Sequence, residues 1–109
     1  MDAETAFAAL AASYAREPDV EFGTGFGSAP GLRVNGKIFA MLQHGELAVK
    51  LPADRCAAMV IAGDARPLTV RQRTMREWVV VEGVDDDVWT ALAADALAYV
   101  RKGTGRAKR

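Results

Sequence analysis

The chain has 109 residues, of which 50% are hydrophobic, one cysteine, and equal numbers of basic and acidic residues, 14 of each. This length predicts one domain that buries roughly two-thirds of its unfolded surface without metal or disulfide support. The longest apolar run, residues 56–62, is much shorter than the ~20 residues of a membrane-spanning helix, and one cysteine excludes an intrachain disulfide. We therefore expect a soluble, cytoplasmic protein with no membrane partner.

The balanced charge is distributed unevenly along the chain. Five of the 14 basic residues lie in residues 101–109, which contain no acid. Residues 1–100 therefore carry 9 bases against 14 acids, a net charge of −5. An acidic body gives no general attraction to nucleic acid. Local attraction is therefore expected only from the basic end and from the arginine run at residues 66–76.

The first predicted element is a helix over residues 2–16. Apolar residues recur there at helical spacing, and Asp2 and Glu4 lie where the positive end of a helix dipole favours acids. Proline at position 18 ends this helix, because the residue before a proline is displaced from the helical conformation. Residues 20–30 mix strand formers with glycines, which predicts an irregular or bulged strand.

Residues 31–51 predict three consecutive antiparallel strands. Asn35-Gly36 suits the type I′ turn of a two-residue hairpin, and residues 43–45 supply a second reversal. The strand between these turns, residues 37–42, is apolar on both faces. This pattern is typical of a central strand.

The second half of the chain predicts two helices and two further strands. Pro52 begins a helix that Gly63 ends as a left-handed cap. Residues 68–70 predict a short edge strand, residues 71–74 a polar connection, and residues 75–82 another strand with two apolar faces. A last helix follows the aspartates at 85–87 and ends near residue 102. We expect one domain at residues 1–102 and a basic, disordered tail at residues 103–109.

The residues with catalytic or metal-binding potential favour structural roles. The glycines at 23–27 match neither phosphate-loop pattern, and the aspartates at 85–87 suit helix capping. His44 lies in a predicted turn, and Cys56 lies on the apolar side of a helix, where cysteine behaves as a small hydrophobe. One histidine and one cysteine do not complete a zinc site without carboxylates from elsewhere. We therefore expect no catalytic residue, no metal and no other cofactor.

The two strands with two apolar faces predict a surface for self-association. If the helices cover one face of the sheet, an alternating set of apolar residues is left on the other, and such a patch favours a homodimer. The candidate interface residues are Phe39, Met41, Val79 and Val81, with Ile38 and Leu42 as the alternative set on the first strand. In the opposing hypothesis, the glycine-rich segment or the arginine loop folds across this face and leaves a monomer.

A second candidate surface would contact the phosphates of nucleic acid. Its residues are Arg66, Arg71 and Arg73 in the arginine run and Arg106, Lys108 and Arg109 at the basic end. The opposing interpretation of the arginine run is a solvated loop whose charges are partly neutralised by nearby acids.

Glycine turns and apolar strand residues follow one another in a distinctive order. They are Phe26-Gly27, Gly31-Leu32, residues 36–40, Lys50-Leu51-Pro52, Arg55, Gly63, residues 75–78, Trp89, Ala96-Leu97 and Val100. This succession resembles the N-terminal domain of the TfoX/Sxy competence regulators, which is related to the YjbR/MmcQ domains. The resemblance implies an α+β domain of order α-β(3)-α-β(2)-α, with helices packed on an antiparallel sheet, as in secretion-chaperone-like folds. It transfers no catalytic residue, whereas the YjbR/MmcQ relatives imply DNA binding by analogy.

Three functions follow from these observations. The first is a non-enzymatic TfoX N-terminal-like domain that regulates through contacts with another protein or with its own copy. The second is a DNA-binding regulator that uses the basic tail and the arginine loop. The third is a small-ligand-binding protein or an enzyme, with a pocket near the glycine segment and Cys56.

Overall fold

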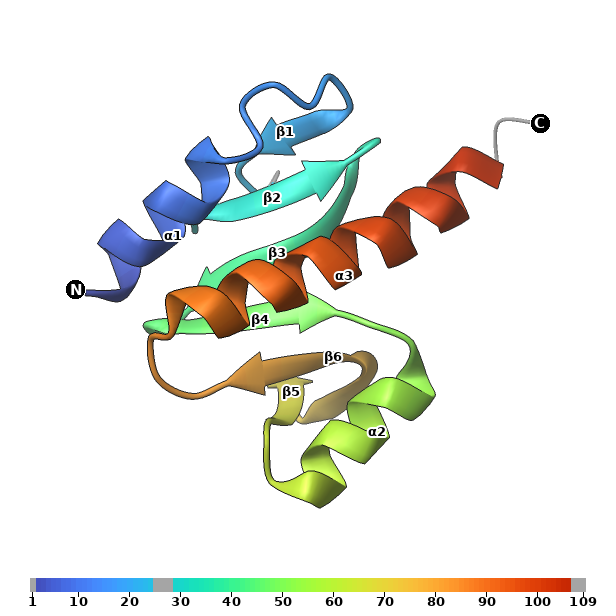
Figure 1. Ribbon diagram of the computed structural model, residues 1–109. Helices are drawn as coiled ribbons and strands as arrows, with labels where there is room; N and C mark the ends of the chain where they lie inside the picture. The colour runs from blue at the N-terminus through green and yellow to red at the C-terminus, as the bar shows by residue number, and fades with distance from the viewer. Residues whose placement is uncertain (1, 25–28, 107–109) are drawn as a thin grey trace.

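The computed structural model describes residues 2–24 and 29–106. Its elements run in the order α1 (Ala3–Ala12), β1 (Val20–Phe22), β2 (Gly31–Val34), β3 (Lys37–Gln43), β4 (Glu46–Lys50), α2 (Ala53–Ala62), β5 (Arg66–Val70), β6 (Arg73–Val81) and α3 (Asp86–Arg106) (Figure 1). The α+β class and the helices packed on an antiparallel sheet are confirmed. No helix among the described residues has the length and apolar character to cross a membrane.

The six strands form one antiparallel sheet in the order β1-β2-β3-β4-β6-β5. The five strands that the TfoX resemblance implies are one too few, because Val20–Phe22 form β1, which pairs with β2 from Val20 opposite Val34 to Phe22 opposite Leu32. The observed order is therefore α-β(4)-α-β(2)-α. An irregular strand was expected over residues 20–30, and of that range residues 25–28 lie outside the described part.

Tight turns join β2 to β3 and β5 to β6. Asn35 and Gly36 have φ angles of 51° and 83°, the left-handed geometry that the predicted type I′ turn requires. The β5–β6 connection also reverses at two residues of positive φ, Arg71 and Gln72. The observed connection is thus shorter than the polar connection predicted over residues 71–74, because Arg73 and Thr74 already belong to β6.

The main core lies between the sheet and the three helices. Helices α1 and α3 lie on the same side of the sheet, and α3 packs across β2, β3 and β4 (Figure 1). Helix α2 packs beside β5 and β6 and adds Cys56 to the same core. The largest fully buried side chains are Trp89, Phe39, Leu32, Leu47 and Leu51.

A β-bulge at Phe39 corrects the predicted interface. Ala40 pairs with Leu32, whereas Ile38 pairs with Arg33, so Phe39 is an extra residue in β3 and the alternation restarts after it. Phe39 therefore faces the main core, whereas Met41 packs with a smaller cluster around Val80. Simple alternation wrongly placed Phe39 and Met41 on one face.

The other two predicted interface residues are also in the main core. Val79 and Val81 are 0% and 7% exposed, and Phe39 is 0% exposed. Of the four, only Met41 remains partly exposed, and it packs, like the partly buried Trp78, against the smaller cluster. The predicted set of four residues is therefore not available as a surface for self-association.

Helix α3 extends beyond its predicted end. Residues 103–106 were expected to be disordered but are helical. The Oγ1 of Thr104 donates to the Arg101 carbonyl at 3.1 Å and accepts from Nδ2 of Asn35 at 2.9 Å. These hydrogen bonds offset the low helix propensity of Gly103. Lys108 and Arg109 lie outside the described residues.

Candidate functional site: a lysine-lined cleft

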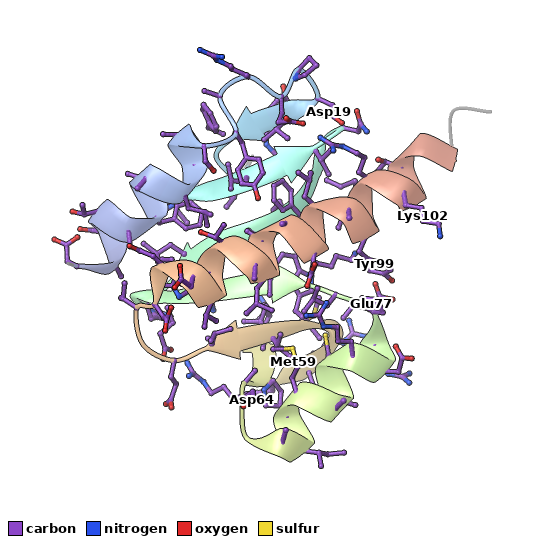
Figure 2. The ribbon with its side chains drawn as sticks, in the orientation of Figure 1. Asp19, Met59, Asp64, Glu77, Tyr99 and Lys102 are labelled. Atoms are coloured by element: carbon purple, nitrogen blue, oxygen red, sulfur yellow. The ribbon has the colours of Figure 1, made fainter. Side chains whose placement is uncertain are left out.

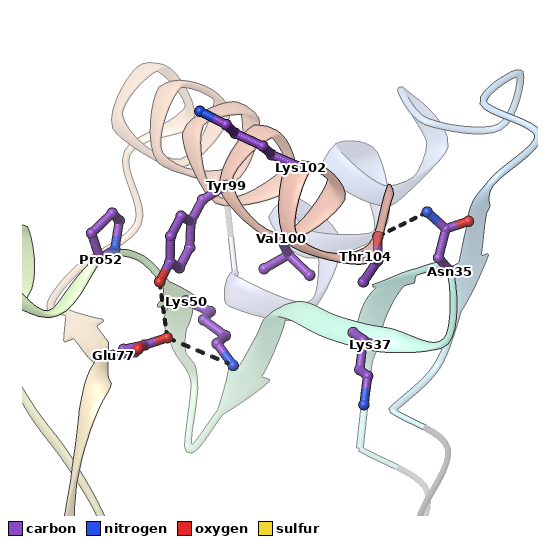
Figure 3. Close-up of a pocket in the computed structure, with 10 residues that line it drawn as sticks. Asn35, Lys37, Lys50, Pro52, Glu77, Tyr99, Val100, Lys102 and Thr104 are labelled. Carbon is purple, nitrogen blue, oxygen red and sulfur yellow. Dashed lines mark hydrogen bonds and ion pairs between the residues drawn. The ribbon is translucent and has the colours of Figure 1, made fainter. Parts of the chain in front are cut away.

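A cleft with a volume of about 840 Å³ lies between the last turns of α3 and one end of the sheet (Figure 3). It is lined by Asn35, Lys37, Lys50, Pro52, Glu77, Tyr99, Val100, Lys102, Gly103 and Thr104. The topology brings these residues together because the start of β3 and the end of β4 lie at the same end of an antiparallel pair. Helix α3 crosses the sheet toward that end and forms one side of the cleft.

Lysines gather in this cleft. The sequence contains four lysines, and Lys37, Lys50 and Lys102 line the cleft, whereas Lys108 lies outside the described residues. Every described lysine is therefore at one site, and no arginine lines it. Three ammonium groups and the single carboxylate of Glu77 give the lining a net charge of +2, although residues 1–100 carry a net charge of −5.

The carboxylate of Glu77 is already engaged. The hydroxyl of Tyr99 donates to Glu77 Oε1 at 3.1 Å, and the Nζ of Lys50 lies 3.9 Å from the same oxygen. Figures 2 and 3 show Glu77 and Tyr99 next to each other, and Lys102 further along α3. Partial burial, followed by the hydrogen bond to Glu77, raises the pKa of Tyr99, so the phenol stays protonated at neutral pH.

The other two lysines are unneutralised. Lys37 and Lys102 are exposed, and neither forms an ion pair within the described part of the chain. Four arginines, by contrast, are paired with acids elsewhere: Arg33 with Glu21, Arg55 with Asp95, Arg66 with Glu46, and Arg101 with Glu17 and Asp19. The cleft therefore retains cationic charge that the protein does not neutralise itself.

Those of the predicted nucleic-acid residues that the structure describes do not form one surface. Arg66 donates to both carboxylate oxygens of Glu46, and this contact lowers the pKa of Glu46. Arg71 and Arg73 are exposed in the β5–β6 hairpin, at one edge of the sheet. The end of α3, which includes Arg106, lies beside the β2–β3 turn. Strands β3, β4 and β6 separate β2 from β5 in the sheet. The arginine loop and the last turn of α3 are therefore separate.

The residues expected to have structural roles occupy such positions. Cys56 is 4% exposed, its thiol donates to the Leu51 carbonyl at 3.5 Å, and burial raises its pKa, so the predicted core role is confirmed. The Asp85 carboxylate accepts from the Val88 amide at 3.1 Å, which confirms capping. His44 is exposed in the β3–β4 turn. In residues 2–24 and 29–106, no group of three or more His, Cys, Asp and Glu side chains is placed to hold a metal.

A second groove, with a volume of about 590 Å³, lies between α2 and β6. It is lined by Cys56 and by largely apolar side chains, among them Val60, Ile61 and Trp78. A groove is thus present near Cys56, where a pocket was predicted. The Cys56 thiol, however, is hydrogen-bonded to the Leu51 carbonyl. The glycine segment, with which that pocket was expected to be shared, lies partly outside the described residues.

The lysine cleft was not predicted from the sequence. Its cations come from three distant segments, and each of them alone is an ordinary surface lysine. The only hint in the sequence is the amino-acid composition, because lysine supplies just four of the 14 basic residues and its positions could have been considered together. No spacing rule connects the start of one strand, the end of the next strand and the last turns of the final helix.

Fold and cleft together define a small α+β domain with one cationic, partly apolar cleft. No protein-family model, curated protein or solved structure matches this chain. The resemblance to the TfoX N-terminal domain therefore stays a prediction. The basis for a function is the geometry of the cleft.

Proposed function

We propose that this chain is a non-enzymatic binding domain that holds a small anionic ligand, one with phosphate or carboxylate groups, in the lysine cleft. One observation carries the proposal: all three described lysines line the same cleft, and its only carboxylate is already bonded to Tyr99 and lies near Lys50. Lys37 and Lys102 are left to attract an anion. A regulatory role would follow if ligand binding alters contacts with another protein.

The size and chemistry of the cleft suit such a ligand. Small-molecule sites usually have volumes of roughly 300–1,000 Å³ and combine apolar walls with a few polar groups. A lysine ammonium is a compact charge on a flexible stem with three donors, and it binds phosphate as a point charge. Lys37 and Lys102 can therefore turn toward an anion without a change in the backbone.

The chemistry of the lining supports binding over catalysis. A nucleophile needs a base within hydrogen-bonding reach. The Thr104 hydroxyl is occupied by Arg101 and Asn35, and the Tyr99 phenol has a raised pKa, which disfavours the phenolate. Cys56 lines the other groove rather than this cleft.

Thermal shift measurements with pyrophosphate and citrate test the proposal. A ligand that binds only the folded state raises the melting temperature as its concentration passes the Kd. We expect both anions to stabilise the wild type and the Lys37→Gln/Lys102→Gln variant to lose this effect. The matched control is Arg71→Gln/Arg76→Gln, which removes two positive charges from exposed arginines outside the cleft and should respond like the wild type.

Two results would contradict the proposal. If neither anion shifts the melting temperature of the wild type, the cleft binds neither anion. If both double variants lose the effect equally, the anions respond to overall charge and the cleft has no special role.

A second candidate function depends on the β5–β6 hairpin. Arg71, Arg73 and Arg76 are exposed there and form no ion pair among the described side chains. A two-stranded ribbon with unpaired arginines suits contact with nucleic-acid phosphates. Binding of duplex DNA, measured over a series of salt concentrations, tests it. The variant Arg71→Gln/Arg73→Gln/Arg76→Gln should bind DNA more weakly, and its affinity should depend less steeply on salt concentration. Lys37→Gln/Lys102→Gln should match the wild type.

A further inference from the structure

The aromatic ring of Tyr99 has a fixed orientation in the lysine cleft. Its hydroxyl is anchored to Glu77, and the apolar side chains of Pro52 and Val100 line the same cleft (Figure 3). An aromatic side chain held at its polar tip and beside apolar neighbours presents a preset surface for another ring. This surface lines the same cleft as the three lysines.

The lining thus divides into two parts. Tyr99 and the partly buried Pro52 supply the apolar wall, to which Val100, only 7% exposed, adds little surface. The exposed Lys37 and Lys102 lie on opposite sides of the cleft, on β3 and on α3. A purely ionic ligand would use the lysines and leave the wall in contact with water.

The charge of Glu77 orients a ligand. Its carboxylate lies at the Tyr99 hydroxyl, so an anionic group at that position would meet like charge. The favourable position for the anion is therefore away from Glu77, where Lys37 and Lys102 supply positive charge from the two sides of the cleft. The remainder of the ligand is then directed toward the ring of Tyr99.

We infer that the ligand of this cleft is a flat aromatic molecule that carries a phosphate or carboxylate group. The inference rests on the proposed function and adds the ligand class. The aromatic part stacks on Tyr99, and the anionic group lies away from Glu77, where it is attracted by the positive charge of Lys37 and Lys102. Asn35 and Thr104 supply polar groups at the α3 end of the cleft.

The experiment compares phenyl phosphate with methyl phosphate, two monoesters that differ in the ring, by NMR titration of the whole chain. We expect phenyl phosphate to bind roughly two- to tenfold more tightly, the range for an aromatic pair. Benzoate in a third arm distinguishes carboxylate from phosphate. Binding by both phenyl phosphate and benzoate supports recognition of either group, and binding by one alone assigns the class to that group.

Variants at position 99 locate the ring. Tyr99→Phe keeps the ring and should retain the preference for phenyl phosphate, whereas Tyr99→Leu should lose the preference and still bind methyl phosphate. Lys37→Gln/Lys102→Gln should weaken both monoesters. If Tyr99→Leu fails to fold, the ring-proton resonances of Tyr99 in the wild type decide instead, since phenyl phosphate should shift them and methyl phosphate should not.

The possible failures are distinguishable. Equal affinity for the two monoesters, with loss of both in the lysine variant, overturns the aromatic ligand and leaves the proposed function intact. A preference for phenyl phosphate that survives in Tyr99→Leu also overturns it, because the ring then binds elsewhere. If neither monoester nor benzoate binds and the anions in the thermal shift experiment also fail, the proposed function is wrong and the inference fails with it.

Discussion

Arg101 on α3 holds Asp19 with two hydrogen bonds of 2.8 Å, from Nε to Oδ2 and from Nη2 to Oδ1. Its Nη2 also donates to Glu17 Oε1 at 2.9 Å. The contact with Asp19 raises the pKa of Arg101, so the guanidinium stays charged. Since Asp19 immediately precedes β1, and its carbonyl accepts from the Asn35 amide at 3.0 Å, this pair connects the last helix to the edge of the sheet.

We expect Arg101→Gln to lower the free energy of unfolding by about 1 kcal/mol. Exposed ion pairs contribute little, but a two-pronged arginine–carboxylate contact in a small network is at the upper end of their range. Urea denaturation measures the loss, and hydrogen exchange should show faster exchange in β1. Arg101→Lys keeps the charge without the planar guanidinium, so its free energy of unfolding should lie between those of the wild type and Arg101→Gln. Unchanged stability in Arg101→Gln would show that the contact is energetically neutral.

The two tryptophans should differ in their contribution to stability. Trp89 is 1% exposed in the main core, and its Nε1 donates to the Gly83 carbonyl at 3.2 Å. Trp78 is only partly buried, against the smaller cluster. Trp89→Ala should cost about 3–5 kcal/mol, the range for a large aromatic cavity, and Trp78→Ala should cost less. Chemical denaturation of both variants checks the order, and an equal or reversed order would contradict the assigned faces.

The bulge in β3 predicts opposite behaviour at two nearby positions. Phe39 is fully buried and contacts the ring of Tyr14 edge to face, with ring centres 6.0 Å apart. Phe39→Ala should therefore cost about 3–5 kcal/mol, whereas Met41→Ala should cost clearly less because Met41 is partly exposed. Thermal melts of the two single variants provide the comparison. Similar losses would mean that Phe39 and Met41 share a face after all.

Alkaline pH should destabilise the fold through its two tyrosines. Burial raises the pKa of Tyr14 and of Tyr99 above the usual 10.0, and the carboxylates of Glu17 and Glu77 act in the same direction. The folded state then holds protons that the unfolded state has released, so stability is complete below about pH 10 and falls as pH rises through the raised pKa values. Unfolding free energies measured on either side of pH 10 should fall less steeply for Tyr14→Phe/Tyr99→Phe than for the wild type. Equal slopes would contradict the raised pKa values.

The sequence by itself determined the parts of the fold that depend on local geometry. Asn35-Gly36 predicts its turn because both residues tolerate positive φ, and Gly63, with a φ of 83°, ends α2 as predicted for the same reason. The central position of β3 also follows from the sequence, since a strand with two apolar faces is poorly suited to an edge. These requirements are carried by a few neighbouring residues, so a single sequence is enough to recognise them.

Only the tertiary structure decided the features that depend on pairing between distant segments. The bulge at Phe39 exists because β2 and β3 pair with a shifted register. Helix α3 continues past Gly103 because Asn35, far away in the sequence, binds Thr104. The lysine cleft has the same origin. The strand order and the path of α3 bring three mutually repelling charges to one end of the sheet, because the burial of apolar surface stabilises the fold by far more than the repulsion destabilises it.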